Sequence, residues 1–325
     1  MSTTTTFSPN RTFAFFGRRF LYDGFYYWLP VFIESEEAKA PIIFAVYSVE
    51  MLMIFLAISM NIYFVYYIIK VCSLHTNLRF ILGCYAFYSI FGVGSRVWLF
   101  ILQLGFIESN ELMMMTFICA CIRVEFFALS TFLLPVIVFE RAFATYYVMN
   151  YETEKRRWVA LISLFIGIIL TFSFSLPSLF TMTSSIYYVV LNIFVISSAS
   201  LTFYVITKYN EEKLQKLKLC ENSSNNEKYT LSARFQCDEN LRVFKVLRYL
   251  FVTICCTMGC IVFCYIMAKF VFEKGSTMSN LFISFFDFFI AFSLILLPVV
   301  CIGHAGHLPF AIRVSDTPRQ TSWFP

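Results

Sequence analysis

The chain has 325 residues, of which 59% are apolar and only 14% are charged, whereas soluble domains carry about 25% charged residues. A soluble fold of this size cannot bury that much apolar surface, so the composition excludes a soluble globular protein and predicts a membrane protein with several spans. The net charge of +5 does not indicate nucleic-acid binding, because the basic residues are confined to particular loops, which is an orientation signal of membrane proteins.

Residues 1–41 precede the first long apolar stretch. They contain no apolar run long enough for a signal peptide, and Arg18-Arg19 interrupts the best candidate. Asn10-Arg11-Thr12 is a glycosylation sequon, which is informative only if this end of the chain faces the outside. We expect residues 1–41 to form an extracellular amino-terminal segment with Asn10 as its glycosylation candidate.

Seven apolar stretches follow, each near the roughly 20 residues that a helix needs to cross the hydrocarbon core of a bilayer. Helices are expected because a spanning segment must satisfy its backbone hydrogen bonds internally. We therefore predict an all-α membrane protein, a bundle of seven transmembrane helices. The predicted spans are 42–69, 80–104, 112–139, 158–180, 186–206, 249–272 and 281–302.

The distribution of lysine and arginine predicts the orientation of this bundle. Seventeen of these residues lie in the loops 70–79, 140–157 and 207–248 and the tail 303–325, against five in the amino-terminal segment and the alternate loops. The bias places the amino terminus outside and residues 303–325 in the cytosol. None of the eleven cysteines then lies in an outward-facing loop, so we expect no disulfide framework.

The loop 207–248 is the one long polar segment between the spans. Lys208 to Leu219 reads as a charged extension of the fifth helix, and Tyr229 to Arg248 alternates apolar and basic residues at helical spacing before the sixth. Two interpretations stay open. The segment is either a pair of helix ends anchored on an anionic leaflet or a docking surface for a cytosolic partner.

Five ionisable residues fall inside the spans, where charges are costly and mark function or pair with one another. At a rise of about 1.5 Å per residue, all of them except Glu125 fall in the outer half of the membrane. We expect the five charges to neutralise one another. One interpretation is a salt-bridge network that fixes helix register; the other, compatible with it, is a polar patch that lines an outward-open ligand cavity. The ligand-pocket candidates are Glu50, Arg96, Arg123, Glu125 and Asp287.

Several function classes are disfavoured by what the spans lack. No histidine lies in a span to serve a metal site, no lysine in 281–302 is placed for a retinal Schiff base, and no glycine-rich loop can cradle a nucleotide. No half-to-half similarity indicates a transporter. We therefore expect a receptor rather than an enzyme, with no cofactor and no metal. The alternative is a ligand-gated channel or another seven-helix membrane protein.

Three motifs in the predicted cytosolic loops carry a resemblance to a known family. Glu140-Arg141-x-x-Ala144-Thr145 with Tyr151-Glu152 ends the third span, and His75-x-Asn77-Leu78 lies in the first inner loop. The chain resembles the nematode serpentine receptors of class epsilon, the Sre family, in these motifs over roughly residues 40–310. The third motif, before the sixth span, includes Arg234, Phe235, Gln236, Glu239 and Asn240.

The resemblance implies a chemosensory receptor of the G-protein-coupled type. It implies a small-molecule ligand, a heterotrimeric G protein as cytosolic partner, and a place in the plasma membrane of sensory neurons. Glu140-Arg141 would then be a switch, in which the carboxylate holds the guanidinium in one state and releases it in another. The alternative is a pair that only anchors the helix end. Tyr151, Glu152 and the motif before the sixth span would contribute to G-protein coupling.

Two features differ from the rhodopsin-like receptors. The seventh span has Leu297-Pro298-Val299-Val300 where those receptors have an Asn-Pro and a later tyrosine, and no outer-loop cysteine can tie the third helix to the second outer loop. Details of activation are therefore not carried over from that class, and G-protein coupling is an expectation from the resemblance.

Overall fold

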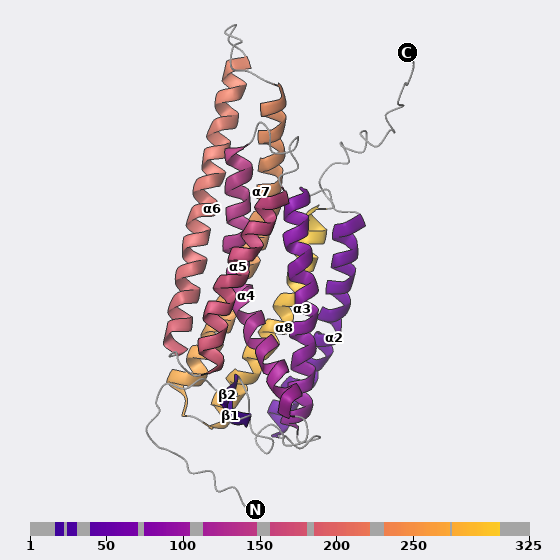
Figure 1. Cartoon of the computed structure of the whole chain (residues 1–325), viewed down its shortest axis with the longest axis vertical. Coiled ribbons are helices and arrows are strands. Elements are labelled where there is room, and N and C mark those ends of the chain that lie inside the picture. Colours follow the sequence, from indigo (N-terminus) through magenta and orange to yellow (C-terminus); the bar gives the residue numbers. More distant parts are fainter. Residues whose placement is uncertain are drawn as a thin grey trace, which may run out of the picture.

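The computed structural model of the chain describes residues 17–22, 25–30, 40–70, 75–104, 113–147, 157–180, 185–221, 231–273 and 275–305. Seven long helices run side by side in these segments (Figure 1). All seven are long and apolar enough to cross a membrane, so the chain is a multi-pass membrane protein and the predicted seven-helix bundle is confirmed. The helices are α2 (Pro41–Lys70), α3 (Thr76–Gln103), α4 (Met113–Tyr146), α5 (Arg157–Leu179), α6 (Ser185–Glu221), α7 (Leu231–Ile266) and α8 (Thr277–Ala305).

The surface of the bundle carries large apolar side chains, as a lipid-facing surface requires. Leu52, Phe165 and Phe194 are 69%, 63% and 68% exposed. Exposed apolar patches of this kind are rare on soluble monomers, and hydrocarbon is the environment that suits them. Polar residues such as Glu50 and Arg96 are buried between the helices instead.

Helix α4 lies at the centre of the packing and contacts α3, α5, α6 and α7, while α2 packs between α3 and α8. The contact of α3 with α4 depends on Gly92. A Cβ atom at this position would lie 2.5 Å from Cγ of Phe126, so the aromatic ring packs directly on the glycine backbone. Close approach of this kind needs a residue without a side chain.

Three helices contain a proline in their interior: Pro135 in α4, Pro177 in α5 and Pro298 in α8. A proline removes the N–H that would bond the carbonyl four residues earlier. In α8 that carbonyl belongs to Leu294, and it accepts a hydrogen bond of 3.0 Å from the buried Asn61 amide of α2. The interruption in α8 is therefore compensated by a neighbouring helix.

A short antiparallel hairpin precedes the bundle and was not predicted from the sequence. Its strands are β1 (Gly17–Tyr22) and β2 (Phe25–Pro30), with Tyr22 paired to Phe25 across the turn. Both strands contact α4 and β2 also contacts α5, at the lower end of the bundle in Figure 1. We call this end of the molecule the hairpin end.

Helices α6 and α7 project beyond the rest of the bundle at the opposite end (Figure 1). The α6 helix has 37 residues and ends at Glu221, and α7 begins at Leu231. The polar residues from Lys208 onward are thus helical, as the charged extension in the sequence predicted. We call this end the projecting end. The Glu140-Arg141 pair lies inside α4, which continues to Tyr146, beyond the predicted span limit of 139.

Candidate ligand-binding site

Four of the five ionisable residues that the sequence singled out form one buried network. Glu50 comes from α2, Arg96 from α3, Arg123 from α4 and Asp287 from α8, and each is at most 3% exposed. Arg96 forms two hydrogen bonds to the Glu50 carboxylate, of 2.8 and 3.1 Å. Its Nη2 also lies 2.9 Å from Asp287 Oδ2, and Asp287 Oδ1 accepts a hydrogen bond from Arg123.

The two guanidinium groups and the two carboxylates balance in charge, and neighbouring polar groups add to the bonding of Arg96, whereas Nε of Arg123 is buried without a hydrogen-bond partner. Arg96 donates to Gln103 Oε1 across 3.1 Å, and Gln103 donates in turn to the Tyr47 hydroxyl across 2.8 Å. The Arg96 guanidinium carbon lies 5.3 Å from the centre of the Tyr47 ring, within the range of a cation–π contact. Buried ion pairs need balanced charge and hydrogen bonds to be stable, and Arg96 has both.

Glu125 is not part of this network. It is partly exposed, its Oε2 accepts a hydrogen bond of 2.5 Å from Ser175 of α5, and it lines a separate hollow between α3, α4 and α5. The expected neutralisation of all five groups therefore involves only four of them. The reason is helix geometry, because residues two apart on a helix point to opposite sides, and Arg123 points to the network.

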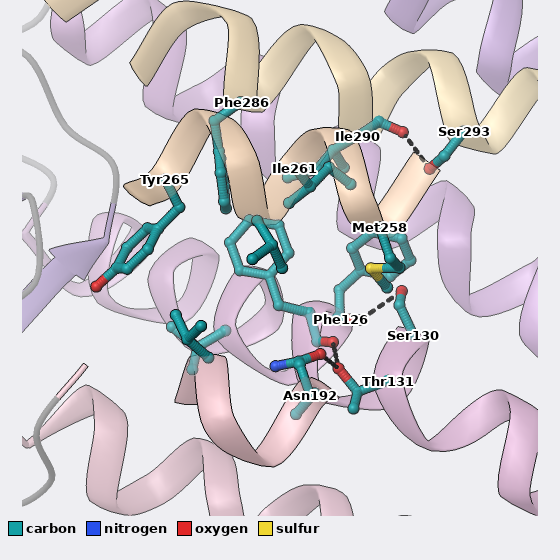
Figure 2. Close-up of a pocket in the computed structure, with 15 residues that line it drawn as sticks. Phe126, Ser130, Thr131, Asn192, Met258, Ile261, Tyr265, Phe286, Ile290 and Ser293 are labelled. Atoms are coloured by element: carbon teal, nitrogen blue, oxygen red, sulfur yellow. Dashed lines mark hydrogen bonds between the residues drawn. The ribbon is translucent and has the colours of Figure 1, made fainter. Parts of the chain in front are cut away.

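A second feature is a cavity of about 140 Å³ between α4, α6, α7 and α8. Its wall is mainly apolar and aromatic, with a few hydroxyl and amide groups. Figure 2 shows side chains from the four helices converging on it. Among the lining residues are Phe127, Thr131, Asn192, Met258, Tyr265 and Phe286.

One hydrogen bond between polar residues of the cavity wall joins α4 to α6. The Thr131 hydroxyl donates to Asn192 Oδ1 across 2.6 Å, as Figure 2 shows. The other lining residues that carry a hydroxyl group are Ser130, Tyr265 and Ser293. An apolar cavity with a few placed polar groups is the usual form of a small-molecule site. Sequence reasoning missed these residues, although Thr131 and Asn192 stand out as polar residues within predicted spans.

One aromatic side chain lies between the ionic network and the cavity. Phe127 lines the cavity, and the guanidinium carbon of Arg123 lies 5.0 Å from the centre of its ring. The Phe127 ring also meets Phe286 edge-on, with 5.8 Å between the centroids. None of the network residues lines the cavity, so the two features touch through Phe127.

At the opposite part of α4, Glu140 and Arg141 form a closed pair. Arg141 donates two hydrogen bonds to the Glu140 carboxylate, of 2.5 and 2.6 Å, and both side chains are at most 1% exposed. Asn210 of α6 donates to the Thr145 hydroxyl of the same motif across 2.9 Å. The described part of the motif, from Glu140 to Thr145, is therefore joined to a second helix, and its motif residues are buried.

His75 connects a second family motif to this pair. Its Nδ1 accepts a hydrogen bond from the backbone N–H of Asn77, which caps α3, and lies 4.0 Å from Glu140 Oε1. Burial and the positive charge of Arg141 lower the pKa of His75 to about 4. An Nδ1 that accepts a hydrogen bond carries no proton, so His75 is neutral near pH 7 and the contact with Glu140 is not an ion pair.

The remaining predicted site residues have no described side chains. Asn10, Tyr151 and Glu152 lie outside the described residues. Arg234, Phe235, Gln236, Glu239 and Asn240 lie on α7, in its projecting part, where the structure describes only the backbone.

Comparison with known proteins gives a consistent result. A family model described as "Sre G protein-coupled chemoreceptor" matches residues 103–305. In Caenorhabditis elegans, "Serpentine receptor class epsilon-1" is 36% identical over 115 residues, 34% of this chain. "Serpentine receptor class epsilon-2" and "Serpentine receptor class epsilon-8" are each 26% identical, over 56% and 60% of this chain. The matches span 31%, 53% and 59% of the lengths of these relatives.

Proposed function

The chain belongs to the Sre G protein-coupled chemoreceptor family, and we propose that it binds an environmental small molecule and signals to a cytosolic heterotrimeric G protein. In this proposal the receptor lies in the plasma membrane of sensory neurons, with the hairpin end outside and the projecting end in the cytosol. The excess of lysine and arginine in the loops of the projecting end supports that orientation.

The observation that carries the proposal is that α4 joins three features. Its stretch 123–131 carries Arg123 of the network and Phe127 and Thr131 of the cavity, and the closed pair of Glu140 and Arg141 follows nine residues later. A displacement of α4 by a ligand therefore acts on both ends of the molecule. This is the structural requirement for coupling two sites through one rigid element.

The ligand-binding step is assigned to the cavity, and the network lies on the other side of Phe127 from it. A molecule that enters the cavity contacts Phe127, and any movement of this ring changes the environment of Arg123 and its bond to Asp287. A buried network in which Arg96 has three polar partners, Glu50, Asp287 and Gln103, can rearrange between discrete sets of bonds. We therefore place Glu50, Arg96, Arg123 and Asp287 in the response to the ligand rather than in its first contact.

The G-protein step is assigned to the projecting end. Release of Arg141 from Glu140 gives a guanidinium that a partner carboxylate or backbone carbonyl can accept. The projecting parts of α6 and α7 offer a docking surface, which includes the α7 motif from Arg234 to Asn240, and Tyr151 and Glu152 are assigned to the same surface.

The test is a ligand screen on cells that express the chain, with a cyclic-nucleotide or calcium readout. For an activating ligand, Thr131→Val should raise the half-maximal concentration about tenfold or more, because a hydrogen-bonding group of the wall is lost. Thr202→Val is the matched control, since Thr202 bonds only the carbonyl of Ser198 and is exposed on α6. A ligand-evoked current that persists when G proteins are inactivated would contradict the proposal and indicate a channel.

A further inference from the structure

Glu125 is the carboxylate that the ionic network leaves out, and its surroundings form a distinct hollow. This hollow, of about 210 Å³, lies between α3, α4 and α5. Glu125 and Ser175 supply its polar groups together with the Tyr88 hydroxyl, and the rest of the wall is apolar. Phe172 and Leu176, on its edge, are each 49% exposed on the surface that faces lipid. The hollow therefore opens toward the bilayer.

The position of Glu125 makes an unpartnered negative charge costly. At about 1.5 Å per residue, Glu125 lies about 18 Å along α4 from its hairpin end, near the middle of a hydrocarbon core of about 30 Å. Among the described residues no lysine, arginine or histidine forms an ion pair with it; its one hydrogen bond comes from Ser175. Carboxylates at such depth pair with a cation or mark a binding site.

We propose that this hollow is a second binding site, distinct from the cavity between α4, α6, α7 and α8, and that it takes a lipophilic amine that enters from the bilayer. The ammonium group binds the Glu125 carboxylate, and the hydrocarbon chain lies along Phe172 and Leu176.

The wall of the hollow matches an amine better than other ligands. Two of the lining residues, Tyr88 and Phe172, are aromatic, and aromatic faces attract ammonium groups. A metal ion is a poor match, because no cluster of three or more metal-binding side chains occurs in the described part of the chain. An anionic lipid would be repelled by the carboxylate. The ligand class that remains has one cationic group on an apolar body.

The test is equilibrium binding of tritiated octylamine to the full chain in phosphatidylcholine nanodiscs, with empty nanodiscs subtracted. Octanol is the matched competitor, because it has the same chain length without the charge. We expect unlabelled octylamine to compete at least tenfold better than octanol. Equal competition by the two compounds would overturn the proposal, and this comparison needs only the wild-type chain.

Variants then locate the binding. Glu125→Gln keeps an acceptor for Ser175 and removes the charge, so octylamine affinity should fall at least tenfold. Glu212→Gln, at an exposed glutamate of α6, should leave the affinity unchanged. Thr131→Val should also leave it unchanged, which separates this site from the proposed receptor cavity. Octylamine affinity that is unaltered in Glu125→Gln would show that the amine binds elsewhere.

Discussion

The buried network predicts a large loss of stability when Asp287 is replaced by asparagine. Asp287 contacts both Arg96 and Arg123, so its neutralisation leaves two arginines with the single carboxylate of Glu50. Breaking a buried ion pair from one side costs roughly 3–5 kcal/mol. At an unfolding entropy of about 2.1 cal/mol/K per residue, this loss lowers the Tm of a chain of this length by about 4–7 °C.

A thiol-reactive fluorescent dye measures this effect in detergent-solubilised protein. Cys119, Cys264 and Cys301 are buried and become reactive when the chain unfolds. Glu125→Gln is the matched control, because it also neutralises an acid within a span but breaks no ion pair with an arginine. The double variant Arg123→Gln with Asp287→Asn should recover part of the loss, since charge balance is restored.

The reasoning is refuted if Asp287→Asn melts within about 1 °C of wild type. It is also refuted if the fall in Tm of the double variant exceeds the sum of the falls of the two single variants, because the two residues would then not stabilise the fold through each other. An equal fall in Tm for Glu125→Gln would show that loss of any membrane carboxylate has the same cost.

Three further predictions concern helix contacts and a titrating residue. Asn61→Leu should lower the free energy of unfolding by roughly 1–3 kcal/mol, because it leaves the buried carbonyl of Leu294 unpaired. The loss should be smaller in the background of Pro298→Ala, because the N–H of the introduced alanine bonds the same carbonyl. Equal losses in both backgrounds would count against the assignment. Gly92→Ala should lower the Tm because its Cβ overlaps a phenylalanine ring, whereas Gly259→Ala, with open space around it, should not; similar melting of the two variants would contradict the packing. His75 has a pKa of about 4 in the fold against about 6.5 unfolded, so its contribution to stability is complete above pH 7 and is lost as the pH falls from about 6.5 toward 4. His75→Asn keeps a capping side chain that does not titrate. Between pH 7.5 and pH 4.5 the Tm of wild type should therefore fall further than the Tm of this variant. Equal falls in Tm for the two proteins would refute the assignment.

The seven helices were predictable because hydrocarbon imposes a length and a composition on any segment that crosses it. The helical extension after Lys208 was also predictable from charge at helical spacing. The hairpin was missed although its signal was present: Asp23-Gly24 lies between two runs of strand-forming aromatic residues, and Asp-Gly is a strong two-residue hairpin signal.

The division of the charged residues was only partly predictable. Helix geometry alone separates Arg123 from Glu125 and places Phe127 and Thr131, four and eight residues later, on the Arg123 face. The ionic partners of Arg96, by contrast, come from α2 and α8, and Glu50 and Asp287 are distant in sequence. Nothing local in the chain specifies which helices become neighbours, so the network could be identified only in the three-dimensional structure.

The central claim is that a ligand in the cavity acts through Phe127 on the network and on α4. The most direct test is the second-messenger response of Phe127→Ala to an activating ligand, compared with Phe165→Ala on the lipid-facing surface of α5. At equal surface expression, the account predicts a lower maximal response and a higher half-maximal concentration for Phe127→Ala, and a wild-type response for Phe165→Ala. A wild-type response of Phe127→Ala would contradict the account.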